Sequence, residues 1–345
     1  AADPIKLSLG GKMTQWAGSV SNQDTFEAAA GASARAFDVK GDSEVYFMGS
    51  TKLDNGLSVS VKMELEADRR AGSATTGDKG VIDNSYMRIA TPSMGAIILG
   101  SVAGSGKAPD AGYGTDHRDA SDWYTTPSTN TLTVQAEATS TEDTSRIDYT
   151  SPSFGGFKVG AGYVPAITVE GFGQPVGSNG GDLSAYYYKA NYDAKFSGVG
   201  LSLAAQYVDI DQNATTTPST ATGSQSWYEW RGQGAVKVAG FTLGGEFRDY
   251  HQENGNDPQV GEVYKVGIGY ETGPYNFTLT RYESSFQGST AVAGDDVVTN
   301  HSLAVAYNMG GGITAKAFYT DFEIEEENKA AVDKNDGHIL AVGIS

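Results

Sequence analysis

The stretch Leu57-Ser58-Val59-Ser60-Val61-Lys62-Met63-Glu64-Leu65-Glu66 alternates apolar and polar side chains at every step. Successive side chains of a β-strand point to opposite faces, so this segment has one oily face and one charged face. The same two-residue alternation returns in segment after segment along the chain. It predicts an all-β protein whose strands separate an apolar environment from water.

Counting the alternating segments between turn signals gives sixteen expected strands. They lie near residues 5–16, 40–53, 57–67, 82–91, 96–101, 144–151, 156–164, 183–193, 199–209, 227–239, 241–251, 260–272, 275–285, 299–308, 313–323 and 337–345. Many of them match the length of about 9 to 11 residues that a tilted strand needs to cross a bilayer. An even number of such strands predicts a 16-stranded antiparallel transmembrane β-barrel, since only a closed barrel satisfies strand backbones in lipid.

The connections between these segments alternate between short and long. Leu53–Gly56, Thr91–Gly95 and Gly273–Pro274 are tight turns rich in Gly, Pro and Asn. Long polar stretches such as 17–39 and 165–182 lie between them. Short turns at one end and long loops at the other are typical of outer-membrane barrels. Within the first long stretch, the Ala-rich residues 26–36 predict a loop helix.

The bulk composition is consistent with a single barrel spanning residues 1–345. No Pro-rich or Ser-rich linker divides the chain, and apolar runs such as Ala96–Leu99 are only four or five residues long, too short for a spanning helix. The mean hydropathy is −0.34. Such a low value fits a barrel because only alternate strand residues face lipid.

Charge and residue usage exclude several classes of function. With 42 acidic against 24 basic residues and a formal charge of −18, the chain lacks the basic footprint of a nucleic-acid binder. It contains no Cys, and its four His residues show no catalytic or zinc-binding spacing. No Gly-rich segment has the context of a phosphate-binding loop. We therefore expect neither an enzyme nor a protein with a cofactor.

One acidic segment near the C-terminus offers candidate ligands for a Ca²⁺ ion. Glu325, Glu327 and Asp333 supply the oxygen ligands that hard cations take, although their spacing is not that of an EF-hand. A solvated acidic loop accounts for these residues more simply.

The chain starts Ala1-Ala2-Asp3, which predicts an exported protein whose signal peptide has been removed.

Two stretches resemble the general, usually trimeric, porins of Gram-negative outer membranes. The first runs from Arg146 to Phe157 and reads RIDYTSPSFGGF, and the second joins NSYMRI at 84–89 to GAIILG at 95–100. The resemblance implies a homotrimer in the outer membrane of a Gram-negative bacterium, in contact with lipid. It also implies that the third long loop, about 102–126, folds into the barrel and narrows the pore. The chain departs from these porins at Ser101, where they often carry Arg, and in lacking a terminal Phe.

Acidic residues predominate in this third loop. Lys107 and Arg118 are its basic residues. Its acidic residues are Asp110, Asp116, Asp119 and Asp122. They predict an acidic constriction and a preference for cations.

Alternation also predicts which charged side chains line the pore wall. With Val59, Val61 and Met63 outward, Lys62 points inward, and the same rule applies to the other strands. The predicted basic wall residues are Lys12, Lys40, Lys62, Arg88, Arg146 and Lys158. Their acidic neighbours on the same face are Asp42, Glu44, Glu64, Glu66 and Asp148. Charges of both signs across a narrow pore filter ions and orient dipolar solutes.

The function predicted from the sequence is passive diffusion of small hydrophilic solutes and ions through a water-filled channel. A substrate-selective channel for a sugar or an organic acid is the first alternative, since Tyr113, Trp123 and Tyr124 could stack against sugar rings. A β-rich surface binding protein is the second alternative. The sixteen similar segments and the alternating loop lengths favour the channel.

Overall fold

A computed structural model describes residues 4–30, 36–67, 82–102, 123, 144–165, 182–213, 226–252, 260–287, 294–327 and 334–345. These ranges contain one helix, α1 (Asp24–Ala30), and sixteen strands. The strands are β1 (Lys6–Ser21), β2 (Phe37–Lys52), β3 (Ser58–Glu66), β4 (Ile82–Thr91), β5 (Gly95–Ser101), β6 (Ser145–Thr150), β7 (Phe157–Val164), β8 (Asp182–Phe196), β9 (Val199–Asn213), β10 (Trp227–Val238), β11 (Phe241–Gln252), β12 (Val260–Thr272), β13 (Tyr275–Phe286), β14 (Asp296–Gly310), β15 (Ile313–Glu325) and β16 (Lys334–Ile344).

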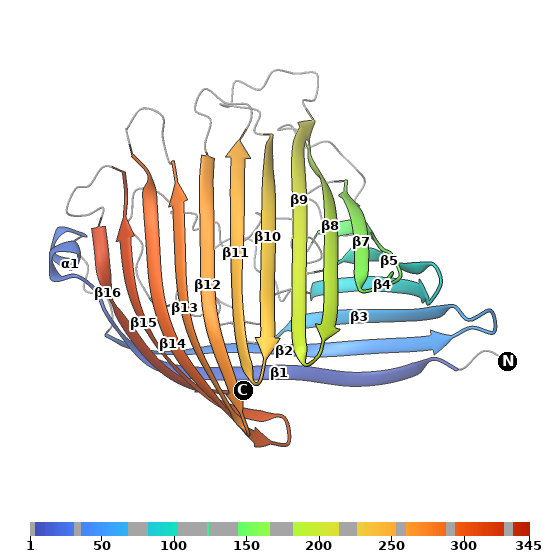
Figure 1. Ribbon diagram of the computed structural model, residues 1–345, viewed down its shortest axis with the longest axis horizontal. Coiled ribbons are helices and arrows are strands. Elements are labelled where there is room, and N and C mark those ends of the chain that lie inside the picture. The colour runs from blue at the N-terminus through green and yellow to red at the C-terminus, as the bar shows by residue number, and fades with distance from the viewer. Residues whose placement is uncertain are drawn as a thin grey trace.

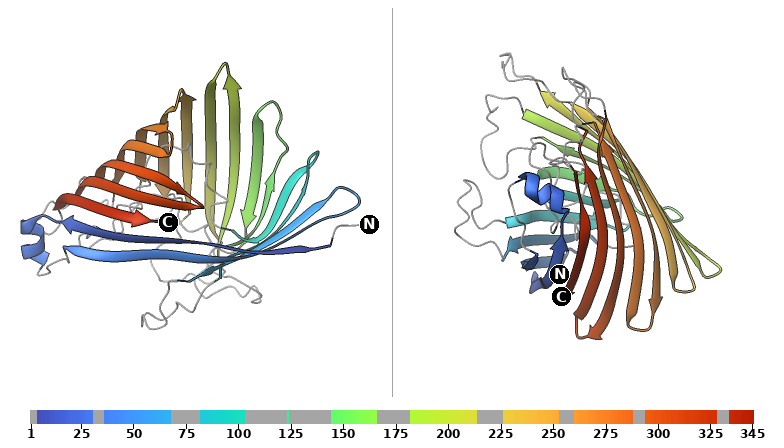
Figure 2. Two further views of the ribbon diagram at one scale, coloured as in Figure 1. Left: turned by 90° about the horizontal axis from the view of Figure 1, so that it is seen from below. Right: turned by 90° about the vertical axis from the view of Figure 1, so that its left-hand side faces the viewer.

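The strands form one closed barrel in which each pairs antiparallel with its neighbours in sequence (Figures 1 and 2). The barrel closes where β1 pairs with β16, from Gln15 opposite Ile344 to Ser21 opposite His338. The 16-stranded antiparallel barrel predicted from the sequence is confirmed. No helix among the described residues is long and apolar enough to cross a membrane.

Some elements differ from their predicted bounds. Strand β1 continues to Ser21, past the predicted end near residue 16, because residues 17–21 pair with β16 even though their small side chains blur the alternation. The loop helix begins at Asp24, two residues before the predicted start. Asp24 and Glu27 in its first turn complement the positive end of the helix dipole.

The register assigns every strand one face toward the lumen and one face outward. Outward side chains are large and apolar, as with Leu7, Leu243 and Leu303, which are 82%, 58% and 56% exposed. Residues of the same strands on the other face include Lys12, Glu246 and Ser302, which are polar. The outward face is therefore suited to lipid and the lumen face to water.

Tight turns mark one end of the barrel. Ser197-Gly198 and Ala239-Gly240 take φ values of 47°, 88°, 50° and 84°, the left-handed conformation of a two-residue hairpin turn. In Figure 1 the turns that join β8 to β9 and β10 to β11 lie together at the lower edge. Strand β1 also begins at this end, and short turns of outer-membrane barrels face the periplasm. We call it the turn side.

Candidate functional site: the lumen wall

The first charged cluster of the lumen wall lies on β1, β2 and β3. The register sets Lys12 opposite Glu44, and the Nζ of Lys12 lies 2.8 Å from Glu44 Oε1 and 3.0 Å from Asp42 Oδ2. Lys62 contacts Glu64, and its Nζ also lies 4.1 Å from the centre of the Tyr46 ring. Tyr46 in turn donates to Glu44. Cross-strand pairing thus builds one continuous polar network over three strands.

A second cluster lies on β10 and β11 and centres on one carboxylate. Arg231 Nη2 lies 2.7 Å from Glu246 Oε2 and Arg248 Nε lies 2.5 Å from Glu246 Oε1, while Gln233 Nε2 donates to Oε2 at 2.6 Å. Glu229 is also buried within this cluster. Glu246 is the carboxylate to which both guanidinium groups donate hydrogen bonds, and buried charges need such partners.

Arg146 on β6 holds the two ends of the third loop. Its Nη2 donates to the carbonyl oxygen of Val102 at 2.6 Å, directly after β5 ends. Its Nε donates to the carbonyl oxygen of Thr144 at 3.3 Å, directly before β6 begins. The side chain is buried, and two residues further along β6 Asp148 Oδ2 lies 3.3 Å from Nζ of Lys189 on β8. Arg146 therefore fixes the point where the loop leaves and rejoins the wall.

An apolar patch on the lumen face receives one residue of that loop. Trp123 packs with a cluster of buried wall side chains that includes Phe318 and Ile339. A Cβ at Gly18 would lie 2.8 Å from the Trp123 ring, so only glycine leaves room for the indole there. Lys40 Nζ lies 5.3 Å from the centre of the same ring. Trp123 is 7% exposed and therefore acts as an anchor against the inner wall.

A sequence profile built on Gram-negative porins matches residues 1–327 of the chain. The chain belongs to the Gram-negative porin family. Family and fold together make it an outer-membrane channel. Among curated protein sequences, none matches the chain.

Solved structures with the same barrel are distant in sequence from this porin. The anion-selective porin of Comamonas acidovorans has a TM-score of 0.62 and 15% identity, with 99% of each chain covered. OmpT of Vibrio cholerae, in a structure described as a trimer form, has a TM-score of 0.62 and 12% identity over 99% of each chain. The channel DcaP of Acinetobacter baumannii has a TM-score of 0.65 and 11% identity, covering 98% of this porin and 96% of that chain.

All six basic residues predicted for the wall take lumen-facing register positions in the porin, but their surroundings differ. Lys12 and Lys62 belong to the first cluster, and Lys40 pairs with Asp38 at 3.6 Å. Arg146 binds backbone carbonyl groups. Arg88 and Lys158 are exposed near the turn side. Their part in ion filtering stays a prediction.

The other predicted site residues divide into two groups. Asp110, Asp116, Asp119, Asp122, Tyr113 and Tyr124 lie outside the described residues, as does the proposed metal ligand Asp333. Glu325 lies 2.5 Å from Lys334 Nζ, and Glu327 is buried. Among the described residues, no group of three or more acidic, His or Cys side chains could hold a metal ion. Trp123, proposed for solute stacking, is enclosed by protein and has little surface to offer a solute.

Sequence reasoning missed the cluster around Glu246. The signal was present, because Glu229, Arg231 and Gln233 alternate along one strand and Glu246 and Arg248 alternate along the next. The same two-residue rule that selected Lys62 places all five on one face. Which acid would meet which base depends on the register between strands, and the sequence of one strand does not contain it.

Proposed function

We propose that this porin forms a water-filled pore for passive diffusion of small hydrophilic solutes and ions. The observation that carries the proposal is the closed barrel whose lumen face is lined by charged and polar side chains. Such a wall excludes solutes by size and by charge, and it makes and breaks no bonds.

Within this proposal, the pore prefers cations. The support is the formal charge of −18 and the excess of aspartate in the third loop. The barrel fold does not fix the sign of selectivity, since the structurally similar porin of Comamonas acidovorans is described as anion-selective.

The porin is further proposed to assemble as a homotrimer. The support is the apolar outward face together with the trimer form described for OmpT of Vibrio cholerae. Outward apolar faces of neighbouring barrels can pack against one another as well as against lipid.

The test is single-channel recording from purified protein in a planar bilayer, with the reversal potential measured in a salt gradient. Large conductance steps in groups of three and a cation-selective potential are expected. Folded protein that gives no steps would contradict the channel, and an anion-selective potential would contradict the proposed preference alone.

A further inference from the structure

Basic side chains gather on the lumen face at the turn side. We define the turn-side ring as the first two lumen-facing positions of each strand next to a tight turn or a chain end. Its basic members are Lys6, Lys52, Arg88, Lys158, Lys195, Lys237 and Lys316. Its acidic members are Asp148, Asp193 and Glu271. The ring is thus positive, although the chain holds 42 acidic and only 24 basic residues.

The bases of the ring also differ from those higher on the wall in their partners. Higher up, Lys12, Lys62 and Arg231 each contact a carboxylate. In the ring, Lys237 lies 2.6 Å from Glu271, and the ring carboxylate Asp148 pairs at 3.3 Å with Lys189, which lies higher on the wall. The charged groups of the other six ring bases have no partner among the described residues. These bases are Lys6, Lys52, Arg88, Lys158, Lys195 and Lys316. Their charge is therefore available to ions in the lumen.

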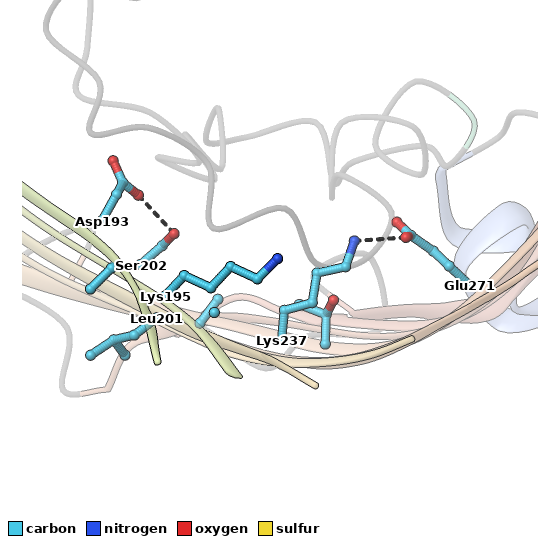
Figure 3. A pocket seen from close by; sticks show the side chains of 10 residues that line it. Asp193, Lys195, Leu201, Ser202, Lys237 and Glu271 are labelled. Carbon is cyan, nitrogen blue, oxygen red and sulfur yellow. Dashed lines mark hydrogen bonds and ion pairs between the residues drawn. The ribbon is translucent and has the colours of Figure 1, made fainter. Parts of the chain in front are cut away.

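A cavity of about 600 Å³ lies on this part of the wall and includes two of the ring lysines. Figure 3 shows Lys195 and Lys237 on the same side of the sheet, with the Lys237 ammonium group held by Glu271. Asp193 is engaged by Ser202, whose hydroxyl donates to it at 2.8 Å. The ammonium group of Lys195 has no such partner. An anion in the cavity would meet it directly.

We propose that the turn-side ring binds small multivalent anions, with a binding site beside Lys195. Such anions should therefore change the ion selectivity of the pore when they are added from the turn side. The inference rests on the proposed channel function. Charges of one sign that line a mouth with low-dielectric walls raise the local concentration of counter-ions. The local concentration of multivalent anions rises most, because their electrostatic attraction to the ring grows with their charge.

The test uses inorganic phosphate at pH 8, largely a dianion, added to one side of a bilayer that holds oriented porin at low ionic strength. At about 0.01 M salt the Debye length is about 30 Å, so the ring acts across the whole mouth, whereas at 1 M it is about 3 Å. Phosphate on the turn side should change the cation-to-anion permeability ratio roughly threefold more than phosphate on the other side. The difference should disappear at about 1 M salt.

Two triple variants with equal charge change separate the ring from net charge. Lys158→Gln, Lys195→Gln and Lys316→Gln together should abolish the difference between the two sides. Lys12→Gln, Lys40→Gln and Lys62→Gln together should keep the difference between the two sides, even where the altered wall charge shifts the absolute selectivity. Resistance of the folded barrel to SDS establishes that each variant has folded.

Because the chain has no Cys, Lys195→Cys supplies a single thiol that reports orientation and allows rescue. In the Lys195→Cys variant, a cationic thiol reagent should restore the phosphate effect. An anionic reagent should reduce the effect below that of the unmodified variant. Open channels with equal phosphate effects from both sides would overturn the inference, and so would a sided effect that survives the ring triple variant. Folded protein without channels would instead remove the proposed function, and the inference with it.

Discussion

Glu246 is the residue on which the polar wall of β10 and β11 most depends. Its two oxygens bind Arg231 and Arg248, and all three side chains are at most 8% exposed. A buried ion pair gains little over an apolar substitute, but removal of one partner leaves an uncompensated charge. In this cluster the loss of the Glu246 carboxylate would leave both guanidinium groups without the carboxylate that they contact.

Glu246→Gln is therefore expected to destabilise the barrel by about 3–5 kcal/mol. The matched control is Glu271→Gln, which breaks the ion pair with Lys237, where both side chains are about half exposed, and should cost about 1 kcal/mol or less. Urea unfolding in detergent, followed by tryptophan fluorescence, measures both. Equal urea midpoints for the two variants would show that Glu246 does not hold the cluster together.

Trp123→Ala should release the third loop from the inner wall. Replacing a buried aromatic residue costs about 3–5 kcal/mol, and here the cost falls on loop docking because Trp123 belongs to no strand. We expect a noisier open-channel current with an almost unchanged unfolding midpoint. Trp230→Ala, on the outward face, is the control. Indistinguishable current noise in the two variants would contradict the anchoring role.

At the scale of elements, the contact between β1 and β16 leaves no room for a side chain at one position. A Cβ placed on Gly337 would lie 1.7 Å from the carbonyl oxygen of Ser21, a distance that no real contact allows. That carbonyl belongs to the backbone and cannot rotate away as a side chain does. Glycine at 337 is what lets the first and last strands approach here.

Gly337→Ala should accordingly lower the free energy of unfolding of the barrel by about 1–3 kcal/mol, the usual cost of overpacking. Gly232→Ala, also within a strand, is the control because a Cβ there would have no atom within 4 Å. The measurement is the temperature at which each barrel loses its resistance to SDS. A drop for Gly337→Ala that does not exceed the drop for Gly232→Ala would contradict the argument.

The sequence predicted these elements well because alternation and turn chemistry are local. The predicted strand at 260–272 coincides with β12, and the tight turn predicted at Gly273-Pro274 joins it to β13. The lumen-facing parity of Lys62 and Arg146 followed from the same rule. The contacts between elements could not be predicted from this rule. The hydrogen bond from Arg146 to Val102 and the packing of Trp123 with Phe318 depend on how the barrel closes in three dimensions.

At the scale of the whole molecule, the distribution of charge matters more than its total. Among the described residues, six of the seven bases of the turn-side ring have no charged partner, whereas Lys12, Lys62 and Arg231 higher on the wall each contact a carboxylate. The sequence of the third loop adds four aspartates, which are predicted to lie at the constriction. A pore of this kind is expected to treat an ion differently according to where along the axis it meets the wall.

Asp116→Asn, Asp119→Asn and Asp122→Asn together should lower the cation-to-anion permeability ratio by roughly twofold or more, because they remove three negative charges from the predicted constriction. The control is Asp249→Asn, Asp321→Asn and Asp336→Asn, which removes the same charge from outward register positions. Reversal potentials at about 0.1 M salt measure both. Unchanged selectivity in the loop variant would remove these aspartates from the constriction.

The pairing of β1 with β16 also bears on how the barrel forms in time. Gly18 and Ala341 are paired residues from opposite ends of the chain, so the contact that closes the barrel has nearly the greatest sequence separation available. Non-local pairings of this kind are slow, because the entropy of a long closure must be lost before the contact repays it. Until then the sheet has two open edges that can pair with other chains. The nascent porin is therefore most prone to aggregate before its final strand arrives.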